Sequence, residues 1–378
     1  MDPLPHAAPD SGPERVSPTG PAAETPPPLP IEAAPVASPP VDISVPFLFH
    51  GSAREYFRIW IVNTLLSLLT CGIFFAWAKV RKRRYLRGST ELCGHRFDYR
   101  ADPVRILVGN AIVTVFFLGY AIFGAVYPVI RYGTIALIVL FLPWVVVRSL
   151  AFNAHNTVYR GLRFRYKPSL AGAVGVYLLQ PVVILLTAGI YYPAWVRARQ
   201  RFTVENHRLG DAFFRFDPPG SKFYSAYLLG GLILGGITAI GGAYLFGLKF
   251  GLKITRPDLI QMLPYFFLYG LGLFIGRHFI FASLFNHLWN HTHLDDHRFI
   301  ASMNVGRWLT LQLSNLGAIL LSCGLLYPWA VIRTLKYKTS CIRFQPAGPI
   351  ERIEYLAVSR GNALGDTAAE FVGLDFGL

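Results

Sequence analysis

Three glycines, each deep inside an apolar stretch, have the same polar side chains around them at the same spacing. They are Gly72, Gly189 and Gly324. A side-chain amide lies nine residues before each glycine and a hydroxyl lies two residues before it; these residues are Asn63, Thr70, Gln180, Thr187, Asn315 and Ser322. Since residues seven apart lie on one face of a helix, each amide shares a face with its hydroxyl.

The three amide and hydroxyl pairs have two interpretations. They could converge on a pseudo-three-fold polar site or pore that handles a solute. Alternatively, they could hold helices together, because membrane helices use interhelical hydrogen bonds of about 0.6 to 2 kcal/mol each. We favour the second interpretation and keep the first as a hypothesis about a polar core.

Two arginines, Arg148 and Arg277, lie at the edges of apolar segments. An ionisable side chain inside the membrane suggests a functional role. Both arginines are also close enough to a segment end to reach the headgroups. Apolar residues continue for several positions beyond Arg277, so we include Arg277 in the candidate polar core.

A histidine cluster near the C-terminal third has the spacing of metal ligands. It consists of His287, His291, His293 and His297. A pair at i and i+4 on a helix suits zinc. An earlier copy of the same motif, however, has Asn156, Val158 and Leu162 where the cluster has histidines. We therefore predict a polar loop and no metal.

The sequence contains no P-loop, no dinucleotide fingerprint and no Ser/His/Asp arrangement. We therefore expect that the protein binds no cofactor and is not an enzyme.

The composition is that of a membrane protein. Of the 378 residues, 53% are hydrophobic and 15% are charged, against about 25% charged in soluble proteins. Roughly 20 apolar residues cross the hydrocarbon core as a helix. Seven candidate segments occur: Trp60–Trp77, Ile106–Ile130, Tyr132–Val147, Leu170–Val196, Tyr224–Leu248, Leu259–Gly276 and Trp308–Ile332.

The two ends of the chain differ from this apolar middle. Residues 1–46 hold 14 of the 27 prolines and have a net charge of −5. Such a segment buries too little apolar surface to fold, so we predict a disordered tail. Residues 345–378 are predicted to form a polar C-terminal tail.

The four cysteines lack the spacing of metal ligands or of a disulfide framework. Cys71 and Cys323 occupy a small-residue position that Ala188 fills in the second copy.

A second repeated motif lies in the polar loops. Thr90-x3-Gly94-x-Arg96-Phe97 recurs from Thr157, and again from Thr292 with Asp296 in place of the glycine. Glycine, or aspartate as its substitute, at a fixed place between short strands indicates a tight turn. We predict small β-hairpins at the membrane surface, with each motif arginine at headgroup level. The predicted fold is an all-α multi-pass membrane protein with internal repeats. Three helix-hairpin units (56–102, 166–220 and 305–345) are separated by helical pairs (104–152 and 224–285).

The order and spacing of these motifs resemble the YjgN-like family of bacterial inner-membrane proteins, a domain of unknown function. The resemblance rests on Phe47-x-Phe49-x-Gly51, on Thr70-Cys71-Gly72-Ile73-Phe74, on Trp77-Ala78-Lys79-Val80-Arg81 and on Arg160-Gly161-Leu162-Arg163-Phe164. It covers about 47–344. It implies a multi-pass protein of the bacterial inner membrane, and no substrate or catalytic residue follows from it.

The positive charge suggests both partners and topology. The formal net charge is +15, and the basic residues cluster at segment ends. We expect anionic lipid headgroups as partners and no nucleic acid. If all seven segments cross the membrane, 23 of the Lys and Arg residues lie on the cytoplasmic side and 13 on the outer side. If the three glycine-centred segments enter and leave on the cytoplasmic side, 32 lie on that side and 4 on the outer side. Both topologies stay open.

Two functions remain after these exclusions. The first is transport of a solute through the pseudo-symmetric repeat core, since repeats with broken helices often place substrates there. The second is a non-transporting, lipid-interacting or scaffolding role, with the basic hairpins as the working surface. Gly231-x3-Gly235 suits close helix packing, within the chain or in a homo-oligomer.

Overall fold

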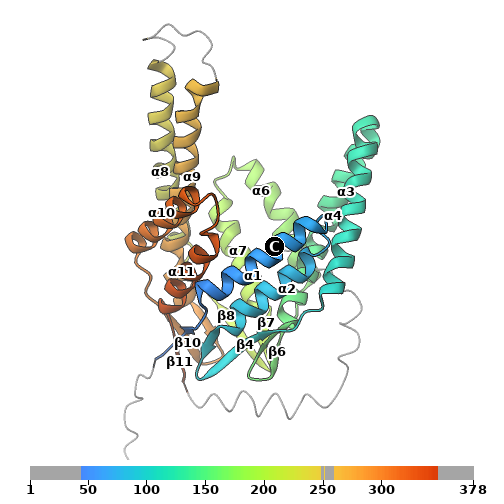
Figure 1. Ribbon diagram of the computed structural model, residues 1–378, viewed down its shortest axis with the longest axis vertical. Helices are drawn as coiled ribbons and strands as arrows, with labels where there is room; N and C mark the ends of the chain where they lie inside the picture. The colour runs from blue at the N-terminus through green and yellow to red at the C-terminus, as the bar shows by residue number, and fades with distance from the viewer. Residues whose placement is uncertain (1–43, 248–250, 252–258, 348–378) are drawn as a thin grey trace, which may run out of the picture. The chain divides into compact units, whose positions relative to one another are not determined.

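The computed structural model describes residues 44–247, 251 and 259–347. The predicted tails lie outside these residues except at their inner ends. Within the described chain, helices and short strands alternate along the sequence (Figure 1). Val45 and Pro46, which were predicted to belong to the disordered tail, form the first strand.

The short strands join one antiparallel sheet. They are β1 (Val45–Pro46), β2 (Leu48–Phe49), β3 (Thr90–Leu92), β4 (His95–Tyr99), β5 (Thr157–Tyr159), β6 (Leu162–Tyr166), β7 (His207–Leu209), β8 (Ala212–Phe216), β9 (Thr292–Leu294), β10 (His297–Ala301) and β11 (Ile342–Gln345). Their order in the sheet is β1-β11-β10-β9-β8-β7-β6-β5-β4-β3-β2. Only Phe47 separates β1 from β2, so one extended segment pairs with β11 by its first half and with β3 by its second. The sheet therefore nearly closes into a barrel.

The prediction of an all-α protein with small, separate hairpins is wrong. Hairpins do form at the repeated motif, but each also pairs with the next one along the chain. Phe97 of β4, for example, lies opposite Tyr159 of β5 across a helical insertion of more than 50 residues. The outer edge of each hairpin has unpaired backbone N–H and C=O groups, and these form hydrogen bonds with the edge of the next hairpin. The local sequence pattern carries no signal for such distant pairing.

Alternating side chains give the barrel an inside and an outside. The inside is filled by Phe97, Phe164, Phe214, Phe299 and Phe344 together with Leu92, Tyr159, Leu209 and Leu294. The motif arginines that precede the phenylalanines, Arg96, Arg163, Arg298 and Arg343, are exposed. The aromatic residues thus pack against one another in the barrel instead of meeting lipid beside their arginines.

The order of the strands places every helical insertion at one end of the sheet. Successive strands run antiparallel, and tight turns alternate with helical insertions along the chain. Two of the turns, Cys93–Gly94 and Arg160–Gly161, have φ values of +48, +77, +50 and +80, the type I′ hairpin geometry. Since the turns share one end of the sheet, the helices leave from the other end (Figure 1).

Each glycine-centred segment folds as two helical arms. The first comprises α1 (Ala53–Leu69) and α2 (Phe75–Gly88); the second comprises α5 (Leu170–Val174), the π-helical η1 (Gly175–Leu179), α6 (Gln180–Leu186) and α7 (Tyr192–Glu205); the third comprises α10 (Val305–Leu321) and α11 (Tyr327–Ser340). We call these the three helical hairpins. The arms of the first and third have 17 and 14 residues, fewer than the roughly 20 that cross a membrane.

The turn between the arms has the same geometry in all three hairpins. A residue with left-handed φ of +48 to +50 (Cys71, Ala188 or Cys323) precedes a glycine with φ of +89 to +90. The glycine N–H donates to the carbonyl five residues earlier at 2.7 to 2.8 Å, and the preceding N–H donates three residues back. This is the Schellman pattern that ends helices. It accounts for both the glycine and the small residue before it.

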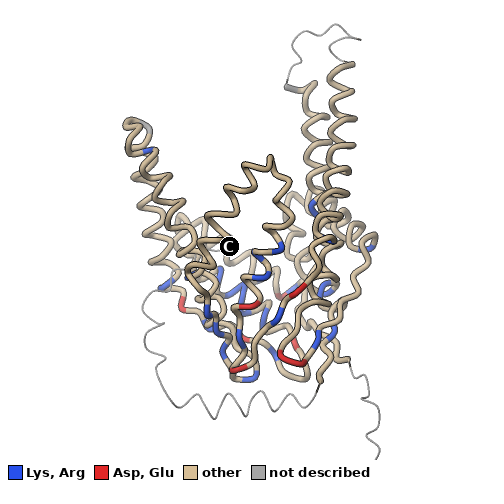
Figure 2. The backbone as a smooth tube through the Cα atoms, turned by 180° about the vertical axis from the view of Figure 1, so that it is seen from behind, with Lys and Arg blue, Asp and Glu red and all other residues tan. Residues whose placement is uncertain are grey.

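Four further helices are long and apolar enough to cross a membrane. They are α3 (Pro103–Val126), α4 (Pro128–His155), α8 (Ser221–Phe246) and α9 (Leu259–Asn290). α8 and α9 approach closely, since a Cβ at Gly276 would lie 3.2 Å from the Gly230 carbonyl oxygen. Gly231 and Gly235 instead face open space. Figure 2 shows Lys and Arg gathered on the strands and the adjoining arms, with few on these four helices.

Candidate functional site

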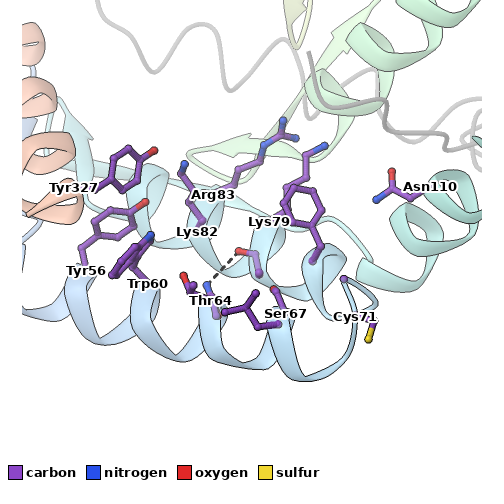
Figure 3. Close-up of a pocket in the computed structure, with 15 residues that line it drawn as sticks. Tyr56, Trp60, Thr64, Ser67, Cys71, Lys79, Lys82, Arg83, Asn110 and Tyr327 are labelled. Carbon is purple, nitrogen blue, oxygen red and sulfur yellow. Dashed lines mark hydrogen bonds between the residues drawn. The ribbon is translucent and has the colours of Figure 1, made fainter. Parts of the chain in front are cut away.

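A cleft of about 900 Å³ lies between the first helical hairpin, Asn110 of α3 and Tyr327 of α11 (Figure 3). The two arms of the hairpin supply most of its lining, including Asn63 and Gly72. α1 also packs directly against α11. The first hairpin therefore forms one wall of the cleft, while the third hairpin and α3 contribute the others.

Three basic residues of α2 project into this cleft. Lys79, Lys82 and Arg83 are spaced i, i+3 and i+4, so they share one helix face, and Figure 3 shows them on one side of α2. All three are half-buried, whereas Arg81 and Arg84 are exposed. None of the described residues that line the cleft is acidic. The lining therefore has a concentrated positive charge.

Neighbouring side chains hold two of these cations in place. One guanidinium nitrogen of Arg83 donates to the Tyr99 hydroxyl at 2.9 Å and to Asn153 Oδ1 at 2.5 Å. Lys82 Nζ lies 5.9 Å from the centre of the Tyr327 ring, a distance at which a cation is attracted to an aromatic face. The positive groups are thus positioned before any ligand arrives.

The cleft also has apolar lining that leads to the tip of the hairpin. Trp60 and Leu68 of α1 and Phe75 at the start of α2 supply it, and the Trp60 ring packs 6.3 Å from that of Tyr327. At the tip, Leu68 is 71% exposed and Leu69 is 78% exposed. A site with cations on one wall and an exposed apolar surface at its edge suits an anionic amphiphile.

The three amides of the predicted polar core are not joined in one site. Asn63 Nδ2 donates weakly to the Ala78 carbonyl in its own hairpin at 3.4 Å. Asn315 donates to Thr334 Oγ1 at 3.0 Å and accepts from Arg333 at 3.1 Å, again within one hairpin. Gln180 Oε1 is buried without a partner among the described residues. Of the three amides, Asn63 is the one that lines the cleft.

The three hydroxyls of the predicted core serve the turns. Thr70, Thr187 and Ser322 each donate to a carbonyl four residues earlier, at 2.7 to 2.8 Å. Each oxygen also accepts from the backbone N–H four residues later, at 3.0 to 3.2 Å. Each hydroxyl thus links the end of one arm to the start of the next.

Arg277 lies apart from the cleft, exposed on α9. Its positive charge, after the larger effect of burial, lowers the pKa of Lys338 on α11. The apolar residues around Arg277 mark it in the sequence, whereas no periodic signal marks Lys338. The electrostatic effect of Arg277 on Lys338 depends on how the third hairpin packs on α9, which the local pattern does not report.

The predicted histidine cluster is spread over the junction of α9 and the sheet. His287 contacts the Pro219 carbonyl at 3.0 Å and His291 contacts the His287 carbonyl at 2.8 Å. His297 accepts from the Ala347 N–H at 3.1 Å, and burial lowers its pKa. These ring nitrogens thus interact with backbone groups. Over the described ranges, no three His, Cys, Asp or Glu side chains group as metal ligands.

A known protein family matches this sequence over most of its length. Residues 44–371 match the model of a family described as "Bacterial protein of unknown function (DUF898)". The chain belongs to this family. The resemblance drawn from the glycine and hairpin motifs is thereby confirmed, and curated relatives with the name YjgN support it.

Three curated relatives are each named "Inner membrane protein YjgN". Those of Escherichia coli K12 and O157:H7 are 30% and 32% identical over 152 and 150 residues, 39% of this chain and 37% of theirs. That of Salmonella typhimurium LT2 is 26% identical over 140 residues, 37% of this chain and 35% of its own. The matched region thus spans little more than a third of these relatives. No solved structure matches the chain.

Proposed function

We propose that this is an inner-membrane protein that binds an anionic phospholipid in the cleft of its first helical hairpin. The observation that carries the proposal is that Lys79, Lys82 and Arg83 line one cleft together with Trp60, Leu68 and Phe75, and that this apolar lining continues into the exposed hairpin tip. A lipid phosphate would lie on the cations and its acyl chains on the leucines. Each Lys or Arg near an anionic surface contributes about 1 kcal/mol.

The sheet supports a single side for all the basic loops. The strands have only two to five residues, whereas a transmembrane strand needs about 9 to 11, and exposed arginines cover the outside of the sheet. The whole sheet therefore lies on one side of the bilayer. Membrane crossing by α3, α4, α8 and α9 alone meets this condition. It also leaves 32 of the 36 Lys and Arg on the sheet side. By the positive-inside rule that side is the cytoplasm.

The positions of charges along the four helices support the same arrangement. Arg148 lies 20 residues after the start of α4 and Arg277 lies 18 residues after the start of α9. At 1.5 Å per residue these are about 30 and 27 Å, close to the roughly 30 Å hydrocarbon thickness. Both arginines then lie at the cytoplasmic headgroups, and Arg148 also packs 5.7 Å from the Trp144 ring, as interfacial residues do.

The hairpin tips fit insertion into the cytoplasmic leaflet. The leucines nearest the turns are among the most exposed side chains: Leu69 at 78%, Leu186 at 81% and Leu321 at 90%. Exposed apolar clusters of this kind mark membrane contact. Their matching positions and turn geometry also support our proposal that the chain contains three copies of one repeated unit.

Solute transport receives less support from the described residues. Aromatic side chains fill the barrel, and Asn63 and Asn315 bond within separate hairpins. We therefore prefer lipid binding without transport as the function.

The test uses phosphatidylglycerol that carries a photoactivatable group in its acyl chain. We expect illumination of the purified protein to label peptides of α1 and α2. The double variant Lys79→Gln, Lys82→Gln should reduce this labelling about tenfold or more, since it removes two cations. Arg81→Gln, on the exposed face of the same helix, is the matched control and should label normally. Equal labelling of the double variant and the wild type would contradict the proposal.

A further inference from the structure

We propose a second phosphate-binding site, at Lys338 and Arg277, where the third helical hairpin packs on α9. Lys338 Nζ lies 4.6 Å from the centre of the Phe281 ring and 5.4 Å from that of Trp308. The two rings pack against each other with centroids 4.9 Å apart, so the ammonium group lies against an aromatic pair at the junction of α9, α10 and α11. The ligand that fits is the phosphate of an anionic membrane lipid.

The donors at this junction lack acceptors among the described residues. Hydrogen-bond and ion-pair partners are described for neither the Lys338 ammonium nor the Arg277 guanidinium. Trp308 is 2% exposed, and its Nε1–H, a donor, is buried without a partner in the described part of the chain. Buried donors left unsatisfied are unfavourable, and so is a desolvated cation beside another cation. An anion would relieve both.

Depth along the membrane helix identifies the source of that anion. Arg277 lies about 27 Å from the far end of α9, which places it at the cytoplasmic headgroups in the proposed topology. Lipid phosphates are concentrated at that level. The site is distinct from the cleft, because Lys338 lies 11 residues after Tyr327 on α11, about 16 Å along the helix.

The same photoactivatable phosphatidylglycerol tests this site by a different set of peptides. We expect labelling of α9 and α10 peptides in the wild type and about tenfold less in Lys338→Gln, with labelling of α1 and α2 unchanged. Lys338→Arg should restore labelling because it keeps the charge. Lys336→Gln, exposed two residues earlier on the same helix, is the matched control. Arg277→Gln, at an exposed position, should also reduce labelling if Lys338→Gln fails to fold.

Two outcomes would overturn this second site. One is unchanged labelling of α9 and α10 in both Lys338→Gln and Arg277→Gln. The other is abolition of wild-type labelling by millimolar inorganic phosphate, which would assign the cations to a free anion. Loss of labelling at α1 and α2 in the Lys79 and Lys82 variant concerns the cleft alone. The outcomes for the two sites are therefore separable.

Discussion

Asn63 and Asn315 occupy matching positions in two hairpins, yet their surroundings differ. Asn315 is 3% exposed, with both polar ends of its amide bonded. Asn63 makes one long bond, and its Oδ1 is buried with no partner in the ranges that the structure covers. A bonded buried amide stabilises the fold, while an unsatisfied atom destabilises it. Asparagine at this position therefore contributes more to the stability of the fold in the third hairpin than in the first.

This contrast predicts unequal effects of one substitution. Asn315→Leu should destabilise the protein by about 1 to 3 kcal/mol, because Thr334 and Arg333 lose their partner. Asn63→Leu should cost less than about 1 kcal/mol, since it also removes an unsatisfied oxygen. Thermal unfolding in one detergent measures both. Equal losses of stability would show that the hydrogen bonds of Asn315 to Thr334 and Arg333 do not determine its contribution.

His207, on β7, predicts a dependence of stability on pH. Burial lowers its pKa, opposed in part by the 2.6 Å contact with the Thr203 carbonyl. A lowered pKa means that the folded state prefers the neutral ring. Its stabilising contribution is therefore complete above the unfolded pKa near 6.5, and it is lost as the pH falls from that value through the lowered pKa of the folded state.

The measurement compares melting temperatures at pH 7.5 and 5.5. We expect the wild type to lose stability at the lower pH, and His207→Gln to lose less of it. His95→Gln, at an exposed position of β4, is the control and should behave like the wild type. A His207→Gln profile as steep as that of the wild type would assign the dependence to other groups.

At the scale of the element, the helical hairpin is the feature that sequence spacing predicts best. Hydroxyl, small residue and glycine are the parts of one turn, and each contributes a hydrogen bond or a left-handed φ. These are local requirements, so they leave a local pattern. The pattern did not reveal whether the arms continue through the membrane or fold back. That outcome depends on packing, such as α1 against α2 and α11.

The turn predicts opposite effects for alanine at two glycines of one region. Gly324 has φ of +90, and Gly324→Ala should cost about 1 to 2 kcal/mol because L-residues avoid that conformation. Gly317 lies inside α10 with open space around it. Gly317→Ala should be neutral or stabilise by up to about 1 kcal/mol. Melting temperatures in detergent give both signs, and a destabilising Gly317→Ala would indicate a packed partner at that face.

At the scale of the whole molecule, the closed sheet is what the sequence could not predict. The Arg-Phe motif marks each hairpin, because alternation and a turn glycine are local signals. Closure needs Val45 to lie opposite Phe344 and Phe49 opposite Thr90. The first of these pairings brings together residues that almost 300 positions separate, and no spacing rule reports it. The cleft was missed for a related reason, since Tyr327 and Lys82 meet only when the third hairpin packs beside the first.

The sheet also makes a prediction about topology. Arg96 on β4 and Arg215 on β8 are both exposed residues of the one sheet, so they should face the cytoplasm together. Val129, 84% exposed near the start of α4, should face the opposite side. A seven-crossing chain would instead separate Arg96 from Arg215. Single cysteines at these positions distinguish the two topologies by labelling intact cells with a membrane-impermeant maleimide.

The background for this experiment must lack the native thiols. Cys71→Ala and Cys323→Ala are the natural choices, because Ala188 has the same left-handed backbone in the second hairpin; Cys93 and Cys341 are changed to serine. We expect Val129→Cys to react in intact cells, and Arg96→Cys and Arg215→Cys to react only after the membrane is permeabilised. Labelling of Arg215→Cys from outside, with Arg96→Cys protected, would place a membrane between strands of one sheet. The barrel and the headgroup sites built on its sidedness would then both be wrong.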